Sequence, residues 1–135
     1  MSETVQIKTP WLASKDPEVP STLNYSTLSM CGRVEEMVRQ YPNYIAYEFM
    51  GKTTTYAEMW QKINACAKSL KAIGIREGDK VTICMPNAPQ TLCMFYAVNM
   101  VGAIANMVHP LSAESEISFY LRDSNSVAAI TLDQF

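Results

Sequence analysis

Apolar residues recur at helical spacing in two segments of the chain. Between positions 27 and 40 they are Met30, Val34, Met37 and Val38, and the run stops at Tyr41-Pro42-Asn43. Between positions 56 and 73 they are Met59, Trp60, Ile63, Cys66, Ala67, Leu70 and Ile73. Each set falls on one face of a helix with charged residues mostly elsewhere, so both segments are predicted to be amphipathic helices.

The second helix carries its own start and stop signals. Thr55-Tyr56-Ala57-Glu58 has the spacing of a capping box, in which the Thr hydroxyl and the Glu carboxylate each accept a backbone N–H of the first turn. Gly74 is placed to end the helix in a left-handed conformation. Just before it, residues 44–50 and 53–55 are β-like and flank Gly51-Lys52, which predicts a β-hairpin.

Three short apolar runs farther along the chain predict buried strands. They are Lys80 to Met85, Ala103 to Val108 and Val127 to Thr131. Helices are expected between them, at Gln90 to Val101 and at Ala113 to Asp123, the latter capped by Ser112. This order implies parallel pairing, and the continuous apolar runs suit a sheet covered on both faces. The fold class is therefore α/β, a short parallel-rich sheet with covering helices.

The first 26 residues differ from the rest, because prolines and polar residues interrupt any regular pattern. We expect an extended arm at 1–26 that wraps the surface, with Trp11 and Leu12 as anchors. Residues 27–135 form the α/β domain. The arm has no apolar segment of the kind that a secretory signal needs.

Composition limits the function classes. The chain has 135 residues, of which 48% are apolar and 18% charged, as in a globular domain. Its net charge is −2, so no basic stripe is available for nucleic acid. The longest apolar run, 91–108, is broken at Gly102, and a buried helix followed by a buried strand explains it better than a membrane span.

Four cysteines and a single histidine provide few metal ligands. None of Cys31, Cys66, Cys84 and Cys93 forms a C-x-x-C pair, and only Cys93 is near His109 in sequence. A zinc site needs close ligand pairs, so we expect no metal site. Cysteines in apolar stretches are typical of small buried side chains in a reducing compartment, which indicates a cytoplasmic protein.

Gly51-Lys52-Thr53 invites comparison with a phosphate-binding loop. A Walker A loop needs a glycine at position 46, where this chain has Ala46, and it precedes a helix rather than joining two strands. A hairpin turn is therefore favoured over a phosphate-loop nucleotidase. We predict no catalytic, cofactor-binding or metal-binding residue in the chain.

His109 is the one candidate substrate-binding residue. With Pro110 it follows a predicted strand at its carboxyl end, where open α/β sheets bind ligands. The alternative is a structural or solvated histidine in a turn. Similarly, Met94, Met100 and Met107 either flank a channel for an acyl chain or simply fill the core.

Four motifs resemble those of one known family. They are Tyr41-Pro42-Asn43-Tyr44-Ile45-Ala46, Thr55-Tyr56-Ala57-Glu58-Met59, Gly74-Ile75-Arg76-Glu77-Gly78-Asp79-Lys80-Val81, and Gly102-Ala103-Ile104-Ala105-Asn106 followed by His109-Pro110-Leu111. In this order over residues 41–132 they resemble the start of the adenylate-forming family, which includes acyl-CoA synthetases, luciferases and nonribosomal adenylation domains. His109 stands where the family usually has Asn. The fatty or long-chain acyl-CoA ligases are the branch that we favour.

The resemblance implies that the chain is the first portion of the family's large N-terminal domain. The parent would join a carboxylic acid, ATP and coenzyme A into acyl-CoA, AMP and diphosphate with Mg²⁺. The family's phosphate loop, acidic contacts and catalytic Lys would lie beyond Phe135, so the chain alone is expected to be inactive. Its expected partners are the remainder of the parent chain, a fatty or other carboxylic acid, and a second copy, because a truncated sheet exposes an edge. The rival interpretation is a stand-alone α/β protein-interaction module without catalysis.

Overall fold

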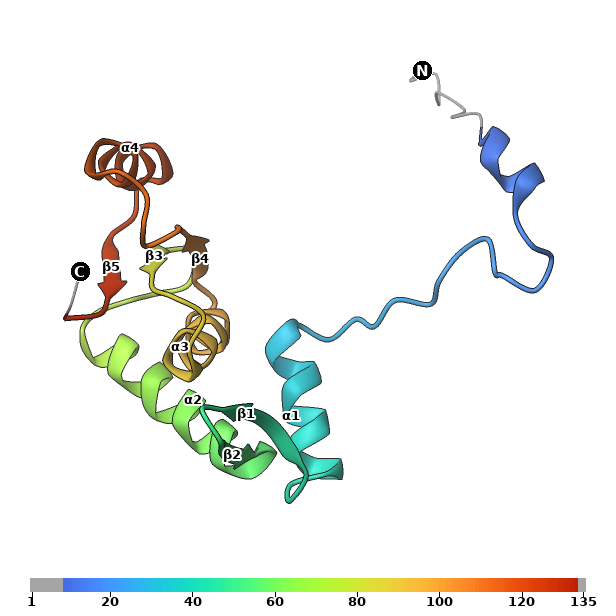
Figure 1. Ribbon diagram of the computed structural model, residues 1–135, viewed down its shortest axis with the longest axis horizontal. Coiled ribbons are helices and arrows are strands. Elements are labelled where there is room, and N and C mark those ends of the chain that lie inside the picture. The colour runs from blue at the N-terminus through green and yellow to red at the C-terminus, as the bar shows by residue number, and fades with distance from the viewer. Residues whose placement is uncertain (1–8, 134–135) are drawn as a thin grey trace.

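The computed structural model describes residues 9–133, and their elements are labelled in Figure 1. The helices are η1 (Pro10–Ser14, a 3-10 helix), α1 (Met30–Gln40), α2 (Tyr56–Ala72), α3 (Pro89–Met100) and α4 (Glu114–Ser124). The strands are β1 (Ile45–Phe49), β2 (Lys52–Thr55), β3 (Lys80–Cys84), β4 (Ile104–Met107) and β5 (Ala128–Thr131). The predicted helices, hairpin and three later strands are therefore confirmed, together with the α/β class.

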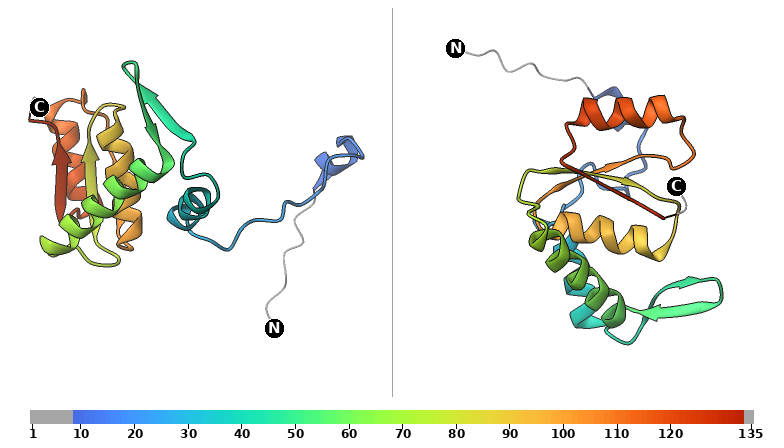
Figure 2. Two further views of the ribbon diagram at one scale, coloured as in Figure 1. Left: turned by 90° about the horizontal axis from the view of Figure 1, so that it is seen from below. Right: turned by 90° about the vertical axis from the view of Figure 1, so that its left-hand side faces the viewer.

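The parallel sheet has the order β4-β3-β5, with β3 in the centre. Val81 of β3 pairs with Ala105 on one side and with Ala128 on the other. The chain leaves β3 through α3 to reach β4, and then crosses back through α4 to reach β5. Because the crossing direction reverses, two right-handed crossovers place their helices on opposite faces. Figure 2 shows this arrangement, with α4 on one face and α3 and α2 on the other.

The core lies between the sheet and the helices α2 and α3. Val81 and Ile83 of β3 are fully buried there, against Ile63 of α2 and Val98 of α3. The half-buried Ile130 of β5 packs on the same cluster. Burying each such side chain contributes about 1.5–3 kcal/mol, which makes this layer the main source of stability.

The face of the sheet under α4 is more polar than predicted. Thr82 is fully buried, and its Oγ1 accepts from Asn106 Nδ2 at 2.9 Å and lies 2.7 Å from Ser126 Oγ. Ser124 Oγ extends this chain at 2.8 Å from Ser126 Oγ. Helix α4 contributes only half-buried apolar side chains here, such as Leu121. Both faces are covered, but the two cover layers differ in kind.

The hairpin and the start of α2 follow their local signals. Met50 and Gly51 both have positive φ, 51° and 78°, as a tight hairpin turn requires. At the capping box, Thr55 N–H donates to the Glu58 carboxylate at 2.8 Å and Glu58 N–H donates to Thr55 Oγ1 at 3.3 Å. The hairpin at Gly51 and the capping box are both confirmed.

The apolar run 91–108 forms α3 and β4, joined at Gly102. This confirms a helix followed by a strand. No helix among residues 9–133 combines the length and the apolar character needed to cross a bilayer.

Three predictions about boundaries and faces were wrong. Helix α1 begins at Met30, because Ser29 provides the cap by accepting from Gly32 N–H. Ser112 does not cap α4. The N-cap is Ala113, whose N–H donates to the Glu116 carboxylate at 3.0 Å. Ile73 lies at the C-cap of α2, where the helix ends before it can turn inward, and it is 72% exposed.

The arm does not wrap the domain surface within its described part. Residues 9–29 contain η1 and then run away from the body, as Figures 1 and 2 show. Trp11 is 61% exposed and Leu12 is exposed as well, so neither anchors the arm to the core. The boundary at residue 26 stays a prediction.

Any other residue at the position of Gly102 is predicted to reduce the stability of the fold. Its φ is +78°, and a Cβ would lie 3.0 Å from Glu77 Cγ and 3.2 Å from Glu77 Cβ. Gly102→Ala should therefore reduce the free energy of unfolding by about 2 kcal/mol, from the left-handed backbone and the contact together. Urea denaturation measures this loss. Gly74→Ala is the control, because its φ is +94° and the added Cβ meets nothing within 4 Å; equal losses in the two variants would contradict the steric contribution.

The capping box predicts an acid-sensitive contribution to stability. The pKa of Glu58 is lowered, first by the hydrogen bond from the Thr55 N–H and then by the Thr55 hydroxyl. A group whose pKa is lowered on folding adds to the free energy of unfolding at pH values above its unfolded-state pKa, which is about 4.3 for Glu. This contribution is lost as the pH falls through the folded-state pKa. Glu58→Gln retains an acceptor but does not titrate, so the stability difference between wild type and variant should shrink on acidification. Urea denaturation across that range tests this, and a constant difference would refute it.

Candidate functional site

The strand order creates a crevice at the carboxyl end of the sheet. Strand β3 connects to α3 on one face, whereas its neighbour β4 connects to α4 on the other. Adjacent strands whose connections leave on opposite faces open a crevice between their carboxyl ends, which is where open α/β sheets bind ligands. The loop at 85–88 and the loop at 108–113 leave the sheet at this point.

Both loops line a pocket of about 440 Å³ that contains His109. The imidazole is exposed, and its Nδ1 accepts a hydrogen bond from Leu111 N–H at 3.2 Å. That bond requires an unprotonated Nδ1, so the neutral ring carries its proton on Nε2 as a donor. Cys84 Sγ donates to the backbone oxygen of His109 at 3.9 Å and ties the loop to β3. His109 is therefore held in the wall of the crevice.

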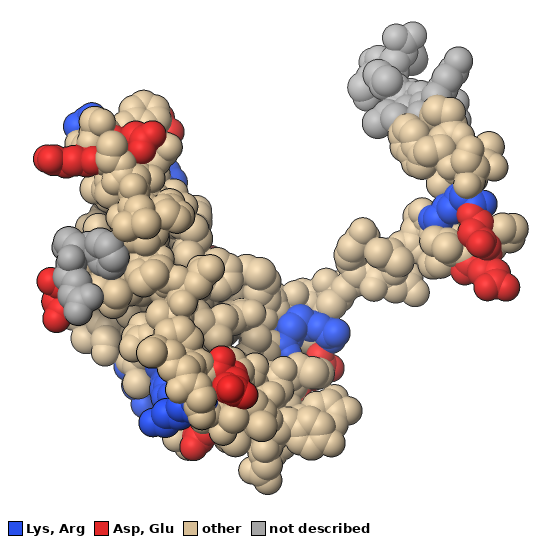
Figure 3. Space-filling view, viewed as in Figure 1, with Lys and Arg blue, Asp and Glu red and all other residues tan. Residues whose placement is uncertain are grey.

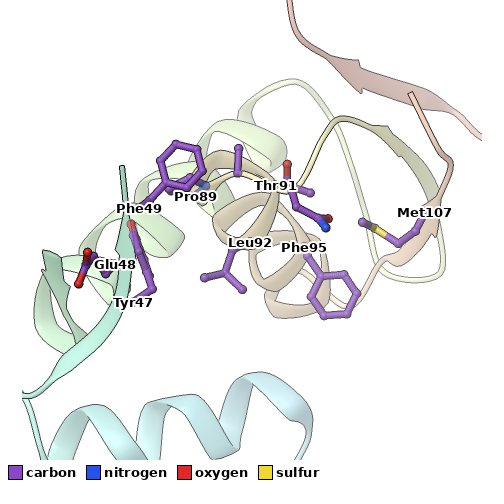
Figure 4. A pocket seen from close by; sticks show the side chains of 10 residues that line it. Tyr47, Glu48, Phe49, Pro89, Thr91, Leu92, Phe95 and Met107 are labelled. Carbon is purple, nitrogen blue, oxygen red and sulfur yellow. The ribbon is translucent and has the colours of Figure 1, made fainter. Parts of the chain in front are cut away.

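A second pocket, of about 360 Å³, lies between β1 and α3. Figure 4 shows Tyr47 and Phe49 projecting from β1 beside Leu92 and Phe95 of α3, with Met107 of β4 at the far end. The wall is mostly aromatic and aliphatic. The volume is within the range of small-molecule sites.

The two pockets adjoin, because Asn87 and Met107 line both of them. We call them together the carboxyl-edge groove. Besides His109, its polar lining includes Glu48, the Asn87 amide and the Thr91 hydroxyl, which donates to Pro86 O at 2.6 Å. No lysine or arginine lines either pocket. The groove is therefore suited to an apolar chain and not to a polyphosphate.

The turn at Gly51 and the acidic, histidine and cysteine side chains were the places where a phosphate loop or a cluster of metal ligands could lie. The turn at Gly51 joins β1 to β2 and is followed by a strand, not by the helix that a phosphate loop precedes. Within residues 9–133, no group of three or more His, Cys, Asp or Glu side chains is placed to hold a metal ion. Figure 3 shows the charged side chains of one face in small separate groups of both signs.

Met94, Met100 and Met107 do not line one common channel. Met107 lines the carboxyl-edge groove, Met94 lines a different pocket between α2, α3 and β5, and Met100 packs on the core. The substrate-binding role of His109 stays a prediction. The aromatic wall formed by Tyr47, Phe49 and Phe95 was not predicted from the sequence. Its only signal was the alternation of Tyr47 and Phe49 on one strand, which does not reveal that α3 lies opposite.

The four cysteines are free thiols. Cys31, Cys84 and Cys93 are buried as predicted, whereas Cys66 is half-buried. Burial raises the pKa of the Cys31, Cys66 and Cys93 thiols, so these three are protonated near neutral pH.

Comparison with known proteins identifies related chains. The family described as "AMP-binding enzyme" matches residues 34–135. The long-chain-fatty-acid–CoA ligase FadD13 of Mycobacterium tuberculosis is 42% identical over 76 residues, which cover 56% of this chain and 15% of that protein. A long-chain-fatty-acid–CoA ligase of Bacillus subtilis is 30% identical over 129 residues, which cover 96% of this chain and 23% of that protein. The chain thus spans less than a quarter of these relatives.

Solved structures share the fold. The inhibitor-bound N-terminal domain of FACL13 from Mycobacterium tuberculosis superposes with a TM-score of 0.70 at 35% identity, covering 73% of this chain and 25% of that one. The N-terminal subdomain of NpsA from Klebsiella oxytoca gives a TM-score of 0.75 at 24% identity, covering 78% of this chain and 28% of that one. The second likeness speaks for the fold alone.

Proposed function

The chain belongs to the AMP-binding enzyme family, and from this premise we propose that it is the first portion of an ATP-dependent acyl-CoA synthetase. The parent enzyme joins a carboxylic acid, ATP and coenzyme A into acyl-CoA, AMP and diphosphate. The observation that supports this most directly is the 42% identity to a long-chain-fatty-acid–CoA ligase. It favours a fatty acid over an aryl or aminoacyl substrate.

The portion described here contributes scaffold and part of the acyl-binding wall. The carboxyl-edge groove supports this role, because aromatic and aliphatic side chains from β1, α3 and β4 enclose an apolar volume of about 360 Å³. His109 lies in the adjoining pocket with Nε2–H as its remaining donor. We propose that this N–H donates a hydrogen bond to a polar group of the bound acid.

The chemistry of adenylation is assigned to the rest of the parent. Attack of a carboxylate on the α-phosphorus of ATP develops charge that cationic and metal groups must stabilise. No lysine or arginine lines the groove, and the described residues hold no acidic cluster for Mg²⁺. The sites for ATP, Mg²⁺ and coenzyme A are therefore proposed to lie in the remainder of the parent. The cytoplasmic location stays a prediction.

Titration calorimetry tests the acyl-binding role. We expect the purified chain to bind dodecanoate, kept below its micelle concentration, and to show no heat of binding with MgATP. Phe95→Ala should weaken dodecanoate binding about tenfold, because it removes an aromatic wall of the groove.

The matched control is Phe119→Ala. Phe119 stacks edge-to-face on its neighbour Tyr120, as Phe95 does on Tyr96, but it lies on α4 away from the groove. Circular dichroism checks that both variants are folded. Equal weakening by both substitutions would remove the groove as the binding site. Absence of dodecanoate binding would favour the interaction-module interpretation, and binding of MgATP would show that a nucleotide site exists here.

Self-association is expected through the edges of the sheet. Strands β4 and β5 each pair only with β3 among the described residues, so each presents an unpaired edge. Light scattering should show a mass that rises with concentration. Ile104→Lys on β4 should reduce association, whereas Ile73→Lys, at the even more exposed C-cap of α2, should not. A concentration-independent monomer would exclude the idea.

A further inference from the structure

A third pocket, of about 510 Å³, lies between α2, α3 and the end of β5. Four sulfur-containing side chains line it: Cys66 from α2, Met85 after β3, and Cys93 and Met94 from α3. We call it the sulfur pocket. Figure 1 shows α2 and α3 side by side below β5, and these two helices pack directly on each other. Sulfur-containing residues from three separate segments thus line one open volume.

The sulfur side chains are graded from the interior toward the mouth. Cys93 is 4% exposed and Met85 is 7% exposed, whereas Cys66 and Met94 are half-buried. The two thiols lie close enough that a charge on Cys66 raises the pKa of Cys93 further, after the larger effect of burial. An ion entering from solvent would therefore meet Cys66 and Met94 before the deeper pair.

We propose that the sulfur pocket is a binding site for a soft, singly charged d¹⁰ cation such as Cu(I), held by Cys66 and Cys93 with Met94 or Met85 as a further ligand. Thiolate and thioether ligands select such cations over hard ones. The described residues offer too few ligands for zinc here, because a structural zinc site takes four and the pocket has neither histidine nor carboxylate. The proposal does not rest on acyl-CoA synthesis.

Charge and proton balance fit this assignment. Binding follows M⁺ + 2 RSH → [M(SR)₂]⁻ + 2 H⁺, so the occupied site carries one negative charge. Lys62 is the one charged residue of the pocket lining. Its ammonium donates to the Tyr47 hydroxyl at 3.4 Å and still lowers the pKa of Cys93 against the larger effect of burial, so it would partly offset that charge. Burial raises the pKa of both thiols, so the empty site is protonated near neutral pH and affinity should increase with pH.

Silver(I) is the probe, because it has the same d¹⁰ configuration and is stable in air. Calorimetry in nitrate buffer, with native mass spectrometry for stoichiometry, should reveal one tight Ag⁺ per chain. Cys66→Ser and Cys93→Ser should each weaken this site at least tenfold, and Met94→Leu by a few-fold. Cys84→Ser is the matched control. Cys84 is buried like Cys93 but lies outside the lining of the sulfur pocket, so its loss should leave the site unchanged.

The variants separate a binding site from general thiol affinity. Circular dichroism and urea denaturation establish whether each variant is folded. If Cys93→Ser does not fold, the half-buried Cys66 and Met94 still decide the matter through their own variants. Unchanged affinity in Cys66→Ser, equal weakening in Cys84→Ser, or the absence of a one-to-one site would each overturn the proposal. None of these results bears on dodecanoate binding, so this proposal and the proposed function fail separately.

Discussion

The central position of β3 is the constraint on which the rest of the structure depends. This strand pairs with β4 on one edge and with β5 on the other, and four of its five residues are buried. Its backbone donors and acceptors are satisfied only when both neighbours are in place. Val81 and Ile83 then fix the sheet on α2 and α3, while Thr82 faces α4. The strand thus couples both layers of helices.

The groove is a consequence of that arrangement. Because β3 and β4 send their connections to opposite faces, their carboxyl ends separate and two loops diverge around an open volume. The hairpin β1–β2 then supplies an outer wall, which brings Tyr47 and Phe49 opposite Phe95. The aromatic character of the wall comes from elements that are distant in sequence. An apolar ligand suits such a surface better than a polyphosphate does.

Local signals allowed most of the fold to be predicted. The capping box at Thr55, the turn at Gly51 and the periodicity of α2 each act over a few residues, and each is present as expected. Failures came where two local solutions compete. Either the Ser112 hydroxyl or the Glu116 carboxylate could accept a backbone N–H at the start of α4. The carboxylate does so, which places the N-cap at Ala113, one residue after Ser112. Ile73 follows the apolar periodicity of α2, but the helix ends at Ala72.

The site was less predictable than the fold for a different reason. The place of His109 follows from a strand ending before Pro110, which is a local signal. The wall at Phe95 depends on how the hairpin packs against α3, and the sulfur pocket depends on how α2 meets α3. Neither contact leaves a pattern within a single segment. Residue type alone therefore pointed to His109, whose role stays a prediction, and gave no sign of the aromatic wall or of the sulfur pocket.

The hydrogen-bonded polar side chains under α4 help to fix the register of the sheet. Ala105, Ala128 and Ala129 are small and would tolerate several alignments against β3. In the observed alignment Asn106 lies beside Thr82 and reaches its hydroxyl. A slip of one residue would turn the Asn106 amide into the apolar layer, where an unpaired polar group costs about 1–3 kcal/mol. The hydrogen bond between Asn106 and Thr82 thus disfavours a slipped alignment of β4, whose small Ala105 alone would not prevent one.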